Sequence, residues 1–301
     1  MLSEKYRPDR LDGIIGQDEI INSLRKFVAE GDIPHLLFVG KPGTGKTTTA
    51  YALARELSIP IQEFNASDER TLEFIRERIK PIAMSKFKQI VLLDEFDSMT
   101  EQAQFALRRL MEQSSVVRFI LTANNDSKIL DAIKSRCAVY RFKPISESKI
   151  RELVINVLRE EKVKFSSKEE VANVLNAVVN YSEGDMRKVF NFLEQIISGS
   201  GINSEFVKTI TSPGLIDGIF KQALSGNLTQ ALVQLEDIYS GVDYSVLINR
   251  FYVESKNLDL KFRAVVLMEL ARAEHAIKMG SNPLVQLSSV VARLFYEAMK
   301  G

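Results

Sequence analysis

The first 145 residues alternate between short apolar runs and longer stretches in which apolar residues return every three or four positions. Short apolar runs bounded by turn residues predict buried strands, and the longer stretches predict amphipathic helices. The predicted strands are Leu36–Val39, Ile61–Phe64, Ile90–Leu93, Arg118–Leu121 and Val139–Phe142. The predicted helices are Asp18–Glu30, Gly45–Leu57, Leu72–Lys80, Thr100–Glu112 and Ser127–Ile133. This alternation predicts an α/β fold with a five-stranded parallel sheet covered by helices on both faces.

After Pro144 the pattern becomes helical throughout, and no stretch predicts a strand convincingly. Three helices are predicted at Ser146–Glu161, Lys168–Tyr181 and Asp185–Ile197. Breaks rich in Gly, Ser and Pro follow at Ser198–Gly201 and Thr211–Gly214, and long amphipathic helices are predicted beyond them at Leu258–Lys278 and Leu284–Met299. We therefore expect three domains: the α/β domain over residues 1–145, a helical domain over 146–205, and an all-α domain over 212–301.

Composition restricts the classes of protein that fit. With 45% hydrophobic and 26% charged residues, the chain of 301 residues has the composition of an ordinary soluble protein. A net charge of +1 argues against a protein that is polybasic throughout, although a local basic face remains compatible with it. No apolar run has the length of a membrane span, and the first residues do not have the pattern of a signal peptide. The single cysteine, Cys137, excludes an internal disulfide and a Cys-rich zinc site, which favours an intracellular protein.

The residues between the first predicted strand and the next helix have the pattern of a phosphate-binding loop, G-x-x-x-x-G-K-[ST]. In such a strand–loop–helix unit, backbone N–H groups and the positive end of the helix dipole bind a polyphosphate. Lys46 is expected to reach the β- and γ-phosphates of ATP, and Thr47 to bind Mg²⁺. We assign the following residues to this nucleotide site: Gly40, Lys41, Pro42, Gly43, Thr44, Gly45, Lys46, Thr47 and Thr48.

Two carboxylates follow the very apolar strand Ile90–Leu93. A strand of this kind is usually buried in a parallel sheet, and its carboxyl end then lies at the same edge as the phosphate-binding loop. We expect Asp94 to hold Mg²⁺ and Glu95 to polarise the attacking water, which indicates an ATPase and not merely a nucleotide-binding protein.

Further motifs narrow the class of ATPase. They are Glu4–Pro8, Ile15–Gln17, Asn65–Arg70, Leu121–Asn124, Ser135–Cys137 and Gly184–Arg187. In this order they resemble the AAA+ clamp loaders, specifically the replication factor C small subunits of archaea and eukaryotes. The resemblance covers nearly all of residues 1–200, whereas residues 212–301 match only as a helical domain of the right length.

This resemblance implies an ATPase that opens a ring-shaped sliding clamp and loads it onto primer–template DNA. It implies ATP and Mg²⁺ as ligands and a hetero-oligomer, of the pentameric kind, with other clamp-loader subunits. It implies an archaeal cytoplasm or a eukaryotic nucleus as the compartment. The residues 146–205 would form the helical lid over the nucleotide, and residues 212–301 the collar through which subunits assemble.

The resemblance also implies roles for single residues. Asn124 matches the sensor of the γ-phosphate, although an Asn at a strand end can also simply form a turn. Arg187 matches a sensor that acts from the lid on the same nucleotide. Arg136 matches the arginine finger, which would act on the neighbouring subunit's ATP. The residues that match the segment around the adenine are Tyr6, Arg7, Pro8, Ile14 and Ile15. The expected catalytic set is therefore Lys46, Asp94, Glu95, Asn124 and Arg136.

For DNA, the resemblance points to a basic helix. Arg70, Arg76 and Lys80 are the expected phosphate contacts, and the alternative is a solvated face paired with Glu73 and Glu77. The apolar segment 81–87 is either a contact with the clamp or part of the core. The sequence departs from the family pattern at Lys41, Thr71, Phe96 and Lys134, which suggests a divergent small subunit.

Two other hypotheses remain open from the sequence. One is a different AAA+ machine, such as a branch-migration motor, an origin-binding protein or a bacterial clamp-loader subunit. The bacterial subunit needs four cysteines for its zinc module, and the motors typically end in a winged helix, for which residues 212–301 offer no hairpin. The other hypothesis is a structural subunit that binds nucleotide with little turnover.

Overall fold

The computed structural model describes residues 1–165, 167–198, 214–239 and 244–300, which form two compact units. The first unit comprises residues 1–162 and 182–194, and the second comprises residues 163–181 together with the chain from residue 195 onward. Most of the predicted breaks at Ser198–Gly201 and Thr211–Gly214 lie outside the described residues. The three predicted domains therefore stay predictions.

A five-stranded parallel sheet lies at the centre of the first unit, in the order β2-β3-β4-β1-β5. This confirms the predicted sheet. The strands are β1 His35–Val39, β2 Ile61–Asn65, β3 Ile90–Asp94, β4 Arg118–Ala123 and β5 Cys137–Arg141. Strand β1 pairs with β4 and β5, although these strands follow it by about eighty and a hundred residues in the chain. The carboxyl ends of β1, β3 and β4 therefore meet at one edge of the sheet.

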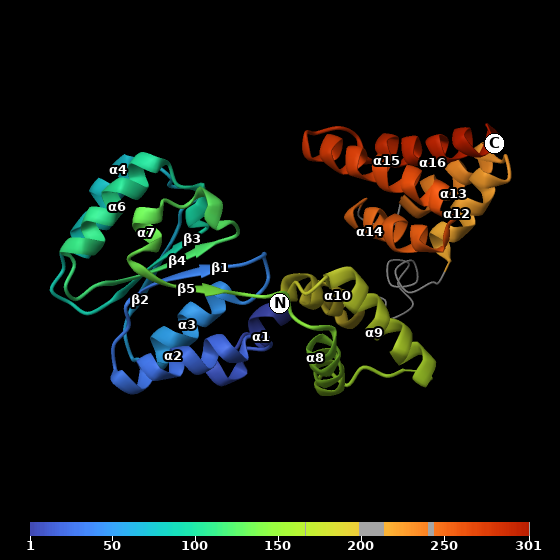
Figure 1. Ribbon diagram of the computed structural model, residues 1–301. Helices are drawn as coiled ribbons and strands as arrows, with labels where there is room; N and C mark the ends of the chain where they lie inside the picture. The colour runs from blue at the N-terminus through green and yellow to red at the C-terminus, as the bar shows by residue number, and fades with distance from the viewer. Residues whose placement is uncertain (166, 199–213, 240–243, 301) are drawn as a thin grey trace. The chain divides into compact units, whose positions relative to one another are not determined.

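Helices cover both faces of this sheet, and Figure 1 shows α4, α6 and α7 on one face and α2 and α3 on the other. The helices of the first 162 residues are α1 Leu2–Lys5, α2 Asp18–Glu30, α3 Lys46–Glu56, α4 Leu72–Phe74, α5 Lys80–Ala83, α6 Glu101–Gln113, α7 Asp131–Lys134 and α8 Glu147–Glu160. Capping fixes several of these ends. The Thr100 side chain accepts from the N–H of Ala103 at the start of α6, and Gly31 ends α2 in the left-handed conformation that glycine tolerates.

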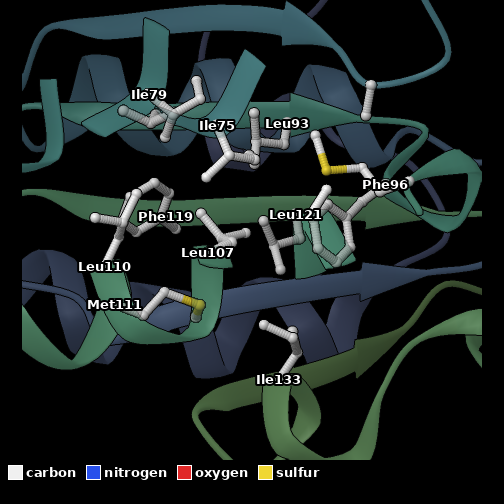
Figure 2. Close-up of a cluster of buried hydrophobic side chains, with 14 of the residues drawn as sticks. Ile75, Ile79, Leu93, Phe96, Leu107, Leu110, Met111, Phe119, Leu121 and Ile133 are labelled. Atoms are coloured by element: carbon white, nitrogen blue, oxygen red, sulfur yellow. The ribbon is translucent and has the colours of Figure 1, made fainter. Parts of the chain in front are cut away.

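Alternate residues of each strand enter two separate hydrophobic clusters, one on each face. Leu36 and Phe38 pack toward α2 and α3, whereas Leu37 and Val39 pack toward α4, α6 and α7. Figure 2 shows the second cluster, in which Leu93, Phe119 and Leu121 meet the helical side chains. The helical members labelled there are Ile75, Ile79, Leu107, Leu110, Met111 and Ile133, with Phe96 from the turn after β3. Burial on both faces explains why the three inner strands β1, β3 and β4 are nearly continuous apolar runs.

The predicted helix Leu72–Lys80 is not a regular α-helix. It begins as α4, widens to a π-helical segment over Ile75–Ile79, and continues as α5. Pro81 has no N–H to donate to the carbonyl of Glu77, and its ring crowds that carbonyl, so the preceding turn widens. The predicted helix Ser127–Ile133 is likewise shorter than expected, because a 3₁₀ turn, Asp126–Lys128, precedes α7.

The remaining helices are α9 Lys168–Ser182, α10 Met186–Ser198, α12 Leu215–Leu224, α13 Leu228–Tyr239, α14 Tyr244–Glu254, α15 Leu260–Lys278 and α16 Pro283–Met299. Within the second unit, α12, α13, α15 and α16 pack around buried residues such as Phe220, Leu235, Val266 and Leu294. The described residues beyond 163 contain helices and turns and no strand, which agrees with the predicted all-α character of this region.

Candidate functional site: a nucleotide cavity at the carboxyl edge of the sheet

A cavity of about 610 Å³ lies at the carboxyl edge of the sheet, between the phosphate-binding loop, the N-terminal segment and the start of α10. All of its lining residues belong to the first unit. The predicted residues that line it are Tyr6, Arg7, Pro8, Ile14, Ile15, Pro42, Gly43, Thr44, Gly45, Lys46, Thr47, Thr48, Asp94, Glu95, Asn124 and Arg187. Gly40 and Lys41 lie just outside the lining, and Arg136 lies elsewhere on the unit.

The phosphate-binding loop is held in shape by close backbone contacts. A Cβ atom on Gly40 would lie 2.6 Å from the carbonyl oxygen of Phe142, so only glycine fits where β1 leaves the sheet. Gly45 has a φ of 96° and caps the N-terminus of α3. Gln17 ties the loop to the chain after β5, because its side chain donates to the carbonyls of Thr44 and Lys143. The loop ends at the N-terminus of α3, which is the positive end of the helix dipole. The backbone N–H groups there can bind anions.

Lys46 is buried at the base of this loop, with only 8% of its surface exposed. Its Nζ donates to the carbonyls of Gly40 and Lys41, at 2.6 and 3.0 Å, and to Oδ1 of Asn124 at 3.1 Å. Burial lowers the pKa of Lys46, the Asp94 carboxylate partly offsets that effect, and Arg187 adds to it. The structure thus brings together the predicted lysine, the acidic strand end and the predicted sensor.

The acidic pair at the end of β3 is positioned by a threonine to which we assigned no role from the sequence. Oγ1 of Thr47 donates to Oδ1 of Asp94 at 3.0 Å. Oγ1 of the buried Thr122 contacts the same Asp94 oxygen and accepts the N–H of Glu95 at 3.1 Å. Glu95 itself has a φ of 55°, a left-handed conformation that is costly for a residue with a side chain and that recurs at functional sites. One hydroxyl on β4 therefore contacts both the Asp94 carboxylate at the end of β3 and the backbone of Glu95 just after it.

Asn124 is oriented by a second residue that the sequence did not single out. The Asp97 carboxylate accepts the N–H of Asn124 at 3.3 Å and that of Asn125 at 3.2 Å. These bonds hold the chain after β4 so that the Asn124 side chain reaches Lys46. Asn65, at the end of the edge strand β2, accepts hydrogen bonds from the backbone N–H and the hydroxyl of Ser67.

The start of α10 contacts the phosphate-binding loop directly. The N–H of Met186 donates to the carbonyl of Gly43 at 3.0 Å, and Asp185 caps the helix by accepting the N–H of Arg187 at 2.8 Å. A Cβ atom on Gly43 would overlap the carboxylate of Asp185, so any other residue at this position requires the Asp185 side chain to move. This packing brings Arg187 to the cavity.

The N-terminal segment forms the apolar end of the cavity. Tyr6 stacks on Phe190 of α10 with 6.1 Å between the ring centres, and its hydroxyl donates to Glu161 at 2.7 Å. Burial and this hydrogen bond raise the pKa of Tyr6. Arg7 lies over the ring of Tyr51 at 5.0 Å. Burial together with a bond to Glu63 raises the pKa of Tyr51 to about 12, so both phenols stay neutral donors at physiological pH. Aromatic and aliphatic surfaces of this kind suit a purine base.

Arg136 is held at a different place on the unit, just before β5. Its NH1 group donates to the carbonyl of Ala132 at 2.8 Å, its NH2 group contacts Glu112, and 28% of its side chain is exposed. Arg136 therefore does not reach the nucleotide cavity of its own chain. Cys137 beside it is largely buried, and burial raises the pKa of its thiol to about 12, which makes it an inert residue and not a nucleophile.

The predicted DNA-contacting residues Arg70, Arg76 and Lys80 are exposed. Within the described part of the chain, none of them forms an ion pair with a carboxylate, so the alternative of pairing with Glu73 and Glu77 is not observed. Beyond them, Met84 and Phe87 are 44% and 81% exposed. The segment 81–87 thus places part of its apolar surface in solvent.

The donors around Thr47 and Asp94 suit Mg²⁺, because a hydroxyl and a carboxylate oxygen lie side by side at the position where a phosphate oxygen can join them. Among the described residues there is no cluster of three or more His, Cys, Asp or Glu side chains that could hold a metal ion without such help. Mg²⁺ in nucleotide sites is typically held by one or two protein groups together with substrate phosphates and water. None of the described helices combines the length and hydropathy needed to span a bilayer.

Two family models match the chain. The model of the ATPase family associated with various cellular activities (AAA) matches residues 36–145, and the replication factor C C-terminal domain matches residues 211–293. Among solved structures, the chain is similar to the RuvB Holliday junction branch migration motor of Thermotoga maritima, with a TM-score of 0.56 and 16% identity over 82% of this chain and 92% of that one. At this identity the likeness shows the fold alone.

Curated relatives match over almost the whole length. The replication factor C small subunit of Aeropyrum pernix is 41% identical over 97% of this chain and 94% of its own, and that of Natronomonas pharaonis is 38% identical over the same shares. Replication factor C subunit 4 of Schizosaccharomyces pombe is 37% identical over 99% of this chain and 91% of its own. The chain therefore belongs to the replication factor C small-subunit family of AAA ATPases, as its motifs predicted.

Proposed function

We propose that the chain is an ATP-dependent clamp-loader subunit that helps to open a sliding clamp and load it onto primer–template DNA during replication. The observation that supports this most is the meeting of Lys46, the Asp94–Glu95 pair and Asn124 at one cavity, in a chain of the replication factor C family. That constellation provides what phosphoryl transfer to water requires, namely charge stabilisation and an oriented nucleophile.

The chain's own residues divide this work. The loop N–H groups and Lys46 would bind the polyphosphate, while the apolar segment around Tyr6 and Ile14 would hold the base. Thr47 and Asp94 would hold Mg²⁺, which neutralises phosphate charge when bound. Glu95 would orient the attacking water, and Asn124 would bond the γ-phosphate or that water. Oδ1 of Asn124 accepts a hydrogen bond from Lys46, so its amide lies beside the lysine that would bind the phosphates.

Full activity would require a neighbouring protomer. Arg136 is remote from its own cavity, and it is partly exposed, so it can act on the nucleotide of an adjacent chain. A guanidinium supplied in trans stabilises the charge of the transition state, which in GTPases is worth about 10³–10⁵ in rate. The proposed oligomer contains other clamp-loader subunits, and its collar would be built from residues 212–301.

The proposed DNA surface is the cluster of exposed cations Arg70, Arg76 and Lys80. Because they are exposed and none of them forms an ion pair with a carboxylate in the described residues, they are available to phosphates. Contacts of this type position a duplex without reading its sequence. We propose the nearby exposed side chains Met84 and Phe87 as the contact with the clamp.

The decisive experiment is the steady-state ATPase rate of the assembled oligomer, with and without a sliding clamp and primed DNA. We expect stimulation that requires both, and we expect the Glu95→Gln variant to lose most of the turnover while it still binds ATP. Indifference to the clamp would favour another AAA+ machine that acts on DNA. Full activity of the Glu95→Gln variant would favour a subunit whose nucleotide is structural.

The DNA surface can be tested separately by the salt dependence of binding. Each lost phosphate contact should reduce the slope of log affinity against log salt by about one. We expect Arg76→Gln to weaken binding and to reduce the slope in this way. Lys26→Gln is the matched control, because Lys26 is an exposed cation on α2, which covers the opposite face of the sheet. Equal effects of the two substitutions would contradict the assignment.

A further inference from the structure

Arg136 is held by a carboxylate from a different helix. Its NH2 group contacts Oε1 of Glu112, which lies in the last turn of α6, while NH1 donates to the carbonyl of Ala132 in α7. Both acceptors precede Arg136 in the chain, by 24 and 4 residues respectively. A long, flexible side chain at the turn before β5 is therefore fixed from two sides.

We propose that Glu112 is a positioning residue for the arginine finger: it orients the Arg136 guanidinium so that its remaining donors face the triphosphate bound by the neighbouring protomer. This inference rests on the proposed function, because it needs Arg136 to act on a nucleotide in trans.

The arrangement of N–H donors in arginine allows Glu112 to position Arg136 without using all of those donors. A guanidinium has five N–H donors in one plane, and the contacts with Glu112, Ala132 and Ser135 involve only NH1 and NH2. Donors are left over for a phosphate while the contact with Glu112 persists. Because 28% of the side chain is exposed, the group is accessible from outside the unit. An arginine that is already ordered gives up less conformational freedom when it meets its target.

Glu112 itself is held in place by a second cation. Nε of Arg108, one helical turn earlier on α6, donates to the same Oε1 atom at 3.2 Å. Partial desolvation acts to raise the pKa of Glu112, but the hydrogen bonds from Arg108 and Arg136 lower it overall. The carboxylate therefore stays ionised at neutral pH, and its contact with Arg136 is charged under working conditions. Because Arg108 and Arg136 share the carboxylate of Glu112, the three side chains together keep one positive charge. This charge can attract a phosphate.

The opposite role predicts the opposite result. If Glu112 stored Arg136 away from the interface, the carboxylate would compete with the phosphate, and its removal would speed hydrolysis. If Glu112 positions Arg136 for catalysis, removal of the carboxylate should slow ATP hydrolysis. The sign of the effect on turnover therefore separates the two roles.

The test is the ATPase rate of the assembled oligomer carrying Glu112→Gln, with Mg²⁺ and ATP as the only added ligands. We expect kcat to fall by about ten- to a hundredfold, the range that misplacement of a catalytic group produces, with KM changed less than twofold. The matched control is Glu101→Gln, which removes an exposed carboxylate from the first turn of the same helix and should leave kcat unchanged. Size-exclusion and thermal melting should show the same oligomer and the same melting point for both variants.

A double substitution shows whether Glu112 acts through Arg136. If it does, Glu112→Gln should produce no further loss in an oligomer that already carries Arg136→Ala. An unchanged or higher kcat for Glu112→Gln alone, or additive losses in the double variant, would overturn the inference. Failure of the proposed function looks different, because then Arg136→Ala would itself leave the oligomer's ATPase rate unchanged.

Discussion

Thr122 connects the two residues of the acidic pair, since its one hydroxyl contacts the Asp94 carboxylate and accepts the backbone N–H of Glu95. Replacement by Val keeps the shape of this side chain and removes both bonds. We expect Thr122→Val to lower kcat about ten- to a hundredfold, the usual cost of removing a group that orients a metal ligand. ATPase titrations should also show that the variant needs a higher Mg²⁺ concentration for half-maximal activity. An unchanged rate with unchanged Mg²⁺ dependence would show that the pair is positioned without Thr122.

Gly43 and Gly45 both adopt positive φ, at 69° and 96°, but their surroundings differ. A Cβ atom at Gly43 would overlap Asp185, whereas nothing lies within 4 Å of one at Gly45. Each Ala substitution should lower the free energy of unfolding by about 1–2 kcal/mol, because a residue with a Cβ atom is strained in the left-handed conformation. We expect Gly43→Ala to lower the melting temperature further, because Asp185 and the start of α10 must move.

The control for the Gly43 prediction is Asp185→Ala, which removes the overlapping carboxylate. In that background the two Ala substitutions should lower the melting temperature, measured by calorimetry without nucleotide, by similar amounts. A larger effect of Gly45→Ala in the original background would contradict the prediction.

Residues that a local motif marks could be placed at the cavity from the sequence, and residues that act through contacts between elements could not. Lys46 and Thr47 follow from the loop motif, and Asp94 and Glu95 from the end of an apolar strand. Thr122 lies inside a motif that we quoted, but its role appears only when β4 lies beside β3. Glu112 lies 24 residues from Arg136, and no pattern in the sequence connects them.

At the scale of elements, amphipathic periodicity located the helices well because most of them bury one continuous face. The predicted limits of α2, Asp18–Glu30, agree with the structure at both ends. The failure at Ile75–Ile79 also has a local cause, since Pro81 disturbs the backbone of the turn before it while the apolar face stays continuous. Periodicity reports which face is buried, and it is insensitive to how tightly the backbone is wound.

A buried carboxylate connects two helices of the second unit and gives a prediction about pH. Oε2 of Glu254, at the end of α14, accepts the N–H of Asp217 in the first turn of α12 at 2.6 Å, and Oε1 lies 2.7 Å from Arg250. Burial raises the pKa of Glu254 above 4.5, although Arg250 acts in the other direction. The folded state therefore binds this proton more tightly than the unfolded chain does, and the group's stabilising contribution is lost as the pH rises through its folded pKa.

We expect the advantage of the natural chain over Glu254→Gln in free energy of unfolding to grow as the pH falls from neutral toward the ordinary pKa of a glutamate, because Gln does not titrate. Urea unfolding of both chains at several pH values measures this difference. Glu274→Gln, on the exposed surface of α15 and paired with Lys278, is the control and should show no such trend. An advantage that grows toward high pH would mean that Arg250 dominates over burial.

At the scale of the whole molecule, assembly is what turns the nucleotide cavity into the proposed machine, because Arg136 cannot serve its own cavity. The long helices of the second unit offer the apolar surface for this. Leu260 and Met268 on α15 are 82% and 58% exposed, and Val285 on α16 is 60% exposed. Large exposed apolar side chains of this kind often mark contacts with other chains.

We expect Met268→Glu combined with Val285→Glu to prevent assembly, because each change would place a charge in an apolar interface. Both side chains are exposed in the single chain, so its fold and its affinity for ATP should be retained. Sedimentation should then show smaller species, and the ATPase rate should fall to that of the Arg136→Ala oligomer, since both variants lack a finger in trans. An oligomer of unchanged size would place the assembly surface elsewhere. A dissociated chain that keeps the full ATPase rate would show that the cavity needs no neighbour, and it would remove the reason for a catalytic Arg136.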